Sequence, residues 1–163
     1  MRTEMKNKQQ MHSMSSQHYG RLLLMMALSF GSMYVLMYAM VNTFANVYSS
    51  FNQFYMAGLM SAPMALLELA LMGAMYPNKK MNAAIAAASL VALSGFWIVI
   101  RQQAVISDEQ FLRSMIPHHA GAILMCQKAS LHDAEIKALC RTIISGQQSE
   151  IDLMKTKLGQ LER

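Results

Sequence analysis

The chain has 163 residues, of which 54% are hydrophobic and only 14% are charged, and its mean hydropathy is +0.23. These values lie outside the range of soluble domains and indicate a membrane protein. The net charge is +5 and the basic residues form no long stripe, so the composition gives no support to nucleic-acid binding. Two cysteines are too few for a disulfide framework, whereas 18 methionines are unusually many.

The first two regions of the chain read as a tail and a membrane domain. Residues 1–19 are polar, basic and rich in Ser and Gln, which predicts a disordered cytoplasmic tail. Region 20–104 then contains three apolar runs at about 22–41, 54–75 and 81–100. Each run has roughly 20 residues, enough for a helix to cross a hydrocarbon core of about 30 Å. The sequence therefore predicts three transmembrane helices in contact with membrane lipid.

The placement of lysine and arginine predicts the orientation of these helices. The basic residues near the spans are Arg2, Lys6, Lys8 and Arg21 in the tail, and Lys79 and Lys80 in the second loop. The first loop carries none, so the tail and the second loop are expected in the cytoplasm. Arg101, directly after the third span, argues weakly the other way. We expect a multi-pass protein of the cytoplasmic (inner) membrane, with its amino terminus inside and region 105–163 extracytoplasmic.

Region 105–163 reads as two helices that form an αα-hairpin. Ser107 and Gln110 match a capping box at the start of the first helix, and Ser130 with Asp133 gives a weaker cap for the second. Two helices with apolar faces bury too little surface alone, so we expect a homodimer that completes a four-helix bundle. Docking of the hairpin onto its own spans is the alternative. The predicted fold class is all-α.

Candidate metal ligands concentrate in the stretch FLRSMIPHHAGAILMC, residues 111–126. Met115, His118, Met125 and Cys126 fall on one face of a helix, and His119 lies at the edge of that face. Thioether and thiolate are soft ligands that select Cu(I), and imidazole also suits copper. The stretch therefore favours a copper ion as the bound cofactor. Pro117 predicts a kink beside the histidine pair.

A turn near Ser130 would set which residues of the two helices face each other. Residues equidistant from the turn lie at one level, which places Gln147 near Met115, Ile143 near His118 and Cys140 near Gly121. Cys126 and Cys140 are then about 7 Å apart along the axis, with a further 8–10 Å between helices, too far for a disulfide. The secondary candidate ligands are Cys126, Cys140, Gln147, Glu150, Met154 and His132.

Three motifs of the hairpin resemble a known family. They are F-x-x-x-M-x-x-H-H-x-x-A-x-x-M from Phe111 to Met125, H-D-x-E-I from His132, and I-I-x-x-Q-x-x-E-I-x-x-M from Ile143 to Met154. Together they resemble the family catalogued as domain of unknown function 305, over roughly residues 107–161 and not over the membrane half. Members resemble ferritin-like helical bundles, and some are periplasmic copper-binding proteins. The resemblance implies Met115, His118, His119 and Met125 as copper ligands.

The expected function is membrane-anchored copper binding, for sequestration, tolerance or transfer of Cu(I) or Ag(I) at the outer side of the cytoplasmic membrane. Copper-handling proteins are then possible partners. A ferritin-like cuprous oxidase ranks lower, because the hairpin lacks an evident base, nucleophile or second carboxylate cluster, and no catalytic residue is assigned. A structural, dimerising membrane protein without metal is the third reading, since methionines such as Met125 and Met154 also fill cores.

The second predicted span carries a further pattern. Met56, Met60, Met64, Glu68 and Met72 recur every four residues. An ionisable residue inside a membrane is by default a functional hypothesis, and the methionines beside it suggest a path for a metal ion. The competing interpretation is that Glu68 is protonated against a neighbouring helix and that the methionines pack.

Overall fold

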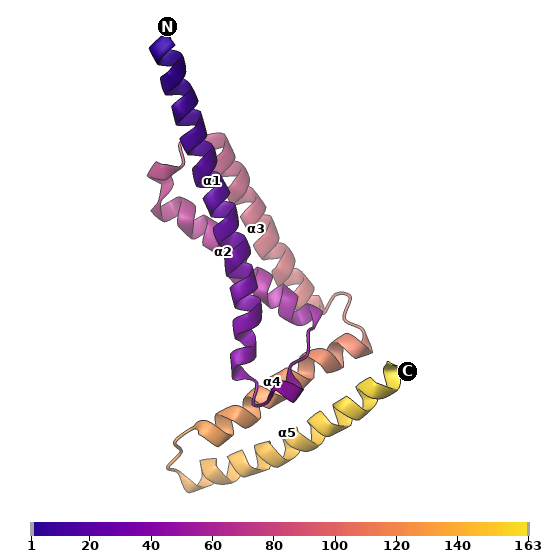
Figure 1. Ribbon diagram of the computed structural model, residues 1–163. Coiled ribbons are helices and arrows are strands. Elements are labelled where there is room, and N and C mark those ends of the chain that lie inside the picture. The colour runs from indigo at the N-terminus through magenta and orange to yellow at the C-terminus, as the bar shows by residue number, and fades with distance from the viewer. Residues whose placement is uncertain (1, 163) are drawn as a thin grey trace. The chain divides into compact units, whose positions relative to one another are not determined.

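The computed structural model describes the backbone of residues 2–162 and the side chains of residues 17–162. Over these residues the regular structure is helical and contains no strand, which confirms the all-α prediction. The α-helices are α1 (Arg2–Leu36), α2 (Phe51–Leu71), α3 (Lys79–Gln102), α4 (Asp108–Lys128) and α5 (Ala134–Leu161) (Figure 1). Three short 3-10 turns join them: η1 (Met37–Met40), η2 (Phe44–Asn46) and η3 (Gly73–Met75).

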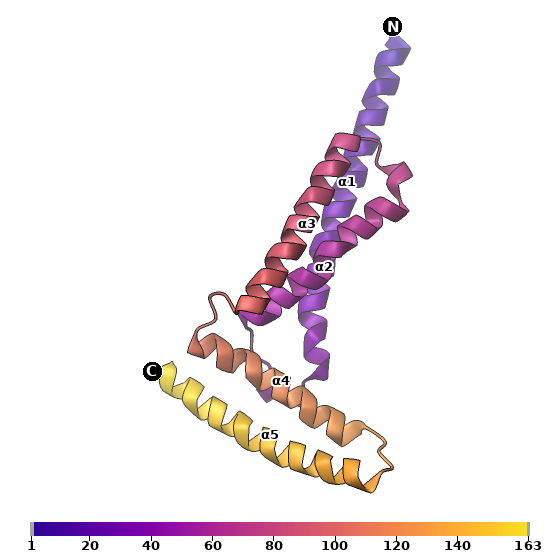
Figure 2. The same cartoon turned by 180° about the vertical axis from the view of Figure 1, so that it is seen from behind.

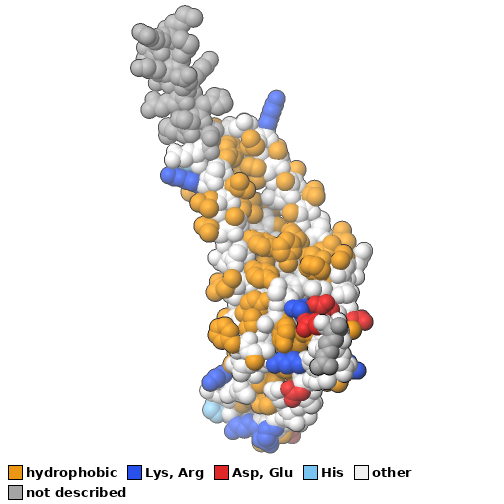
Figure 3. Space-filling view, turned by 45° about the vertical axis from the view of Figure 1, so that its right-hand side comes forward, with side chains coloured by type: hydrophobic (Ala, Val, Ile, Leu, Met, Phe, Trp, Pro, Cys, Tyr) orange, Lys and Arg blue, Asp and Glu red, His pale blue; other side chains and the backbone are white. Residues whose placement is uncertain are grey.

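Three helical segments are long and apolar enough to cross a membrane: Gln17–Met40, Phe51–Leu71 and Lys79–Gln102. They coincide with the three predicted spans to within a few residues at most ends, so their number and position are confirmed. Figure 3 shows apolar side chains spread over these helices, whereas Lys, Arg, Asp and Glu side chains gather over the hairpin.

The backbone of the amino-terminal segment is helical. α1 begins at Arg2 and continues without a break into the first candidate span. Met, Lys, Gln and Arg dominate the segment and have good helix propensity. Extending an existing helix also avoids the cost of a new nucleus. The polar composition of this segment therefore argues against its burial, but it does not argue against helix formation.

The chain divides into two compact units, and the first comprises residues 1–34 and 55–102. Within it, α2 buries one face made of small residues: Ala57, Gly58, Ser61, Ala62 and Ala65. The ring of Phe96 in α3 occupies the space that a Cβ at Gly58 would need. Small residues on one helix therefore allow a large aromatic ring of another to approach its backbone, as is common between membrane helices.

A hydrogen-bonded cluster lies in the turn between α2 and α3. The Tyr76 hydroxyl donates to Oε1 of Glu68 at 3.0 Å, and the Asn82 side-chain amide donates to the Tyr76 carbonyl at 2.9 Å. The Tyr19 hydroxyl of α1 donates to Oδ1 of Asn82 at 2.6 Å. Tyr76 is buried, and this burial is the main reason why the pKa of its phenol is raised above the ordinary value. Its hydrogen bond to Glu68 raises the pKa further.

The second unit comprises residues 35–54 and 103–163. Residues 35–54, which include the ends of the first two candidate spans, therefore group with residues 103–163. The core is formed by Ile116, Ala120 and Ile123 of α4 with Ile151 and Leu158 of α5, and Val41 and Tyr48 pack against it. α4 and α5 lie side by side along their length in both ribbon views (Figure 2), confirming the αα-hairpin.

The two hairpin helices begin at identifiable caps. The Ser107 hydroxyl accepts from the backbone amide of Gln110, as the capping pattern predicts. The start of the second helix was predicted wrongly at Ser130. Instead, the carboxylate of Asp133 accepts from the amides of Glu135 and Ile136 at 2.8 and 2.9 Å, so α5 starts at Ala134. The negative charge of Asp133 at the helix amino terminus makes it a better cap than Ser130.

Candidate metal site on the helical hairpin

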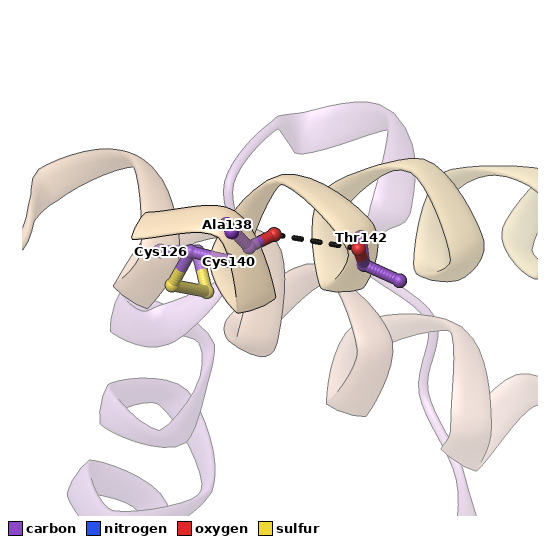
Figure 4. The surroundings of a disulfide bond; sticks show 4 residues. All are labelled: Cys126, Ala138, Cys140 and Thr142. Atoms are coloured by element: carbon purple, nitrogen blue, oxygen red, sulfur yellow. Dashed lines mark hydrogen bonds between the residues drawn. A yellow bond between two sulfur atoms is a disulfide. The ribbon is translucent and has the colours of Figure 1, made fainter. Parts of the chain in front are cut away.

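A disulfide joins the two hairpin helices near their connection. Cys126 is two residues before the end of α4 and Cys140 lies in the second turn of α5, and their Cα atoms are 5.3 Å apart (Figure 4). This separation lies within the range that disulfides require. The expectation that the two cysteines are too distant is therefore wrong. Both sulfur atoms are bonded to each other, so neither supplies a thiolate for a metal ion in this structure.

The expected register failed because the reversal point was misplaced. The chain was taken to reverse near Ser130, whereas residues 129–133 form the connection and Asp133 caps α5. Asp133 is seven residues from each cysteine, which brings the two to the same level. Cys140 therefore faces Cys126 and not Gly121. Each other residue of α4 likewise faces a residue of α5 that lies closer to the carboxyl terminus than expected.

His119 is the best-defined candidate ligand of the hairpin. Its Nδ1 lies 2.9 Å from the Met115 carbonyl oxygen, one turn earlier on α4. Its Nε2 lies 2.8 Å from Oε2 of Glu150 on α5. The ring is mostly buried, with 11% of its side chain exposed, while the carboxylate of Glu150 is open to solvent. The imidazole is thus held at both nitrogens between the two helices.

The donor chemistry of this arrangement is restrictive. A carbonyl oxygen only accepts hydrogen bonds, so Nδ1 must carry a proton to bind Met115, and an ionised carboxylate also only accepts. A hydrogen on Nε2 or on the facing Glu150 oxygen would join these two atoms, and a metal ion could take its place. Donation of one ring N–H to a carbonyl while the other nitrogen faces outward is the usual arrangement of metal-binding histidines.

The spacing of the two facing atoms is that of a direct hydrogen bond. Nε2 of His119 and Oε2 of Glu150 lie 2.8 Å apart, the usual length of a charge-assisted N–H···O contact. Two ligands of a tetrahedral ion, each about 2.0–2.2 Å from it, lie farther apart than this. Binding of an ion between the two side chains therefore requires them to separate slightly.

The structure does not bring all predicted ligands together. His118 is exposed, and its ring centroid lies 6.0 Å from that of His119 in an edge-on arrangement. Met115 is half-buried one turn before His119. Met125 is 54% exposed and lies about two turns beyond His118, so it is remote from His119. α4 continues through Pro117 as one helix.

The secondary candidates separate in the same way. Met154 packs against the hairpin core, as its alternative interpretation predicts. His132 is exposed in the connection between the helices. Gln147 has a buried side-chain oxygen without a hydrogen-bond partner in the described part of the chain, one turn before Glu150. Within the described residues, Glu150 of this group forms a polar contact with a principal candidate, His119.

Residues 17–162 contain no group of three or more His, Cys, Asp or Glu side chains arranged to hold a metal ion. His119 and Glu150 therefore supply two donors, and a third must come from a thioether, a reoriented His118 or outside the chain. Sequence reasoning missed that these two residues face each other. Asp133 was the available signal, because starting α5 after it brings His119 within about a turn of Glu150.

Sequence reasoning also missed the contact at the open end of the hairpin. The Arg113 guanidinium binds Glu109 one turn earlier at 2.7 Å and Glu162 near the end of α5 at 2.6 Å. Together with the disulfide near the connection and the His119–Glu150 pair between them, it ties α4 to α5 at three levels. The central pair is held in place from both sides.

Comparison with protein families identifies the chain. The model of the family described as domain of unknown function (DUF305) matches residues 1–158. The chain belongs to this family. The match covers the candidate membrane helices of the DUF305 chain as well as the hairpin, so the restriction of the resemblance to residues 107–161 was wrong.

One similar protein of known sequence comes from a virus. The uncharacterized protein L153 of Acanthamoeba polyphaga mimivirus is 33% identical over 142 residues, which cover 85% of the DUF305 chain and 91% of the relative. The similarity therefore spans both units. No solved structure matches the chain.

Proposed function

We propose that this chain is a membrane-anchored copper-binding protein that holds the ion on its hairpin at His119. The observation that carries the proposal is the two-sided placement of the His119 ring, with Nδ1 on the Met115 carbonyl and Nε2 directed at Glu150. This fixes the ring orientation before any ion binds, which lowers the cost of binding.

Copper is favoured by the donors around this pair. His119 and Glu150 would hold the ion from facing helices, and the thioether of Met115 lies one turn before His119 on the same side of α4. Imidazole suits several first-row metals, but a thioether selects Cu(I) and its soft relative Ag(I). His118 is the further nitrogen donor within reach of the same turn. The bound ion would be sequestered or passed to copper-handling proteins.

The proposed location is the cytoplasmic membrane, with the amino terminus inside and the hairpin outside. The distribution of lysine and arginine favours this orientation. The Cys126–Cys140 disulfide supports it independently, because disulfides persist in oxidising compartments and are rare in the cytosol. A reporter that works only outside the membrane, fused to the carboxyl terminus, should be active. Activity of a cytosol-only reporter at that end would overturn the orientation.

The copper proposal is tested by metal analysis of the full-length protein purified in mild detergent. The double variant His118→Ala/His119→Ala should lose about one bound copper or silver ion per chain. Glu150→Gln should weaken binding at least about tenfold, since it removes the facing charge. His132→Ala is the matched control, because this exposed histidine in the connection should not matter. Unchanged affinity in the double variant would exclude the pair as ligands.

The same preparation separates binding from catalysis. A binding protein should not raise oxygen consumption above the spontaneous oxidation of the same Cu(I) without protein. Oxygen uptake that depends on His119 would replace the binding proposal with a cuprous oxidase. This arm uses the full-length chain and the same control variant, His132→Ala.

We also propose that two copies associate through α5. Ile136, Leu139, Leu153 and Leu161 are exposed apolar residues within one stripe along this helix, beside the face that packs on α4. A second copy would cover the stripe and complete a four-helix bundle. Leu139→Lys/Leu153→Lys should convert a dimer to a monomer by mass measurement in mild detergent. Ser145→Lys, on the other side of α5, should not. A monomeric parent protein would contradict the proposal.

A further inference from the structure

A row of methionines runs along α2 within the membrane unit. Met56, Met60 and Met64 follow one another at intervals of four residues and lead to Glu68. Each step advances about 6 Å along the helix and turns about 40° around it, so the four side chains form one slanting row. Met56 and Met60 are 38% and 43% exposed, and Met64 and Glu68 are half-buried.

Packing within this unit does not explain the row. The buried face of α2 is made of small residues, from Ala57 to Ala65, and the methionines lie beside that face. Lipid contact does not require sulfur either. Many exposed apolar side chains of the other two helices are hydrocarbon, such as Leu23 and Leu28 on α1 and Leu90 and Val91 on α3. The first candidate span also carries methionines, namely Met25, Met26, Met33, Met37 and Met40, but it contains no Asp or Glu. The row on α2 is distinguished by the carboxyl group of Glu68 at its end.

The carboxyl group at the end of the row is held in place. Oε1 of Glu68 accepts a hydrogen bond from the buried Tyr76 hydroxyl at 3.0 Å. A carboxyl group within a spanning helix is costly to ionise unless a positive charge accompanies it, and otherwise it holds a proton. A monovalent cation beside Glu68 would take the place of that proton, and the thioethers would add ligands without adding further charge.

We propose that Met56, Met60, Met64 and Glu68 form a membrane-embedded binding row for a soft monovalent cation, Cu(I) or Ag(I). Side chains four residues apart have Cβ atoms about 5–6 Å apart, and methionine is unbranched and flexible enough for two thioethers to converge on one ion. Soft sulfur ligands select these cations over Na⁺ and K⁺. The row goes beyond the proposed hairpin function, because it uses no residue of α4 or α5.

The test measures silver binding, since Ag⁺ mimics Cu(I) without redox chemistry. The full-length protein carrying His118→Ala/His119→Ala is reconstituted in lipid nanodiscs, so that the hairpin pair does not contribute. Adding Met60→Leu/Met64→Leu should remove about one bound silver ion per chain. These exchanges conserve volume, and unchanged helical circular dichroism verifies the fold. Single variants serve if the double variant does not fold.

The control is Met25→Leu/Met26→Leu in the same background. It removes two half-buried thioethers of α1 that are adjacent in sequence and so cannot converge on one ion. Silver binding should not change in this control. Equal loss in the control and the row variant, or no loss in the row variant, would overturn the proposal. If silver binding falls on changing His118 and His119 but does not fall further on changing Met60 and Met64, the proposed hairpin function is supported and the row on α2 is excluded as a silver site.

Discussion

Reduction of the Cys126–Cys140 disulfide should loosen the hairpin by a predictable amount. The two cysteines are separated by 14 residues in sequence. The chain-entropy model gives about 3 kcal/mol for a loop of this size, because the cross-link restricts the unfolded chain. At 1.4 kcal/mol per factor of ten, opening of the hairpin should become roughly one hundredfold more frequent.

Amide hydrogen exchange reports this opening directly. The full-length protein is compared in one detergent before and after reduction, and protection is followed at core positions such as Ile116 and Ile151, which are fully buried. Protection there should fall by about the factor stated above. The double variant Cys126→Ser/Cys140→Ser is the control, since a reductant should leave its exchange unchanged. Equal protection before and after reduction, or two alkylatable thiols in protein purified without reductant, would refute the reasoning.

Three further outcomes follow from individual contacts. Ile151→Ala should cost about 2–5 kcal/mol of hairpin stability, because this fully buried side chain lies in the α4–α5 core, and denaturant titration measures the loss. Arg113→Ala should cost less than about 1 kcal/mol, since its ion pairs are partly exposed, and exchange should rise only near Glu162. The pKa of the Tyr76 phenol is higher in the folded than in the unfolded chain. The contribution of this phenol to the free energy of unfolding is therefore complete below about pH 10 and is lost as the pH rises through the folded pKa. Tyr76→Phe should remove this alkaline loss in a pH-dependent unfolding series, and an unchanged profile would exclude Tyr76 as its source.

The elements of this fold were predictable where one local signal decides them. Uninterrupted apolar length identifies the three spans, and Ser107 marks the start of α4. The facing pairs of the hairpin were not predictable in the same way, because register depends on where the chain reverses. Ser130 and Asp133 both resemble caps, and the choice between them decides whether Cys126 meets Cys140 and whether His119 meets Glu150. An error of three residues at a turn is small locally but changes the apparent chemistry of the site.

The boundary between the units shows a second limit of sequence patterns. Residues 35–54 read as the end of a span and an uncharged loop, yet Val41 and Tyr48 pack on the hairpin core. The Tyr38 hydroxyl donates to the Tyr48 carbonyl at 2.9 Å and so closes this segment on itself. Hydropathy describes only the solvent that a segment prefers. It carries no information about which of two neighbouring units the segment joins.

The close approach of Phe96 to Gly58 has a consequence for how the family can vary. Because the aromatic ring fills the volume of the missing side chain, position 58 can enlarge only if the ring at position 96 moves or is replaced by a smaller side chain. In homologues the two positions should therefore change together, with alanine or serine at the first accompanied by a smaller aliphatic residue at the second. Such paired replacement would record the α2–α3 contact in the family's sequences, independently of any coordinates.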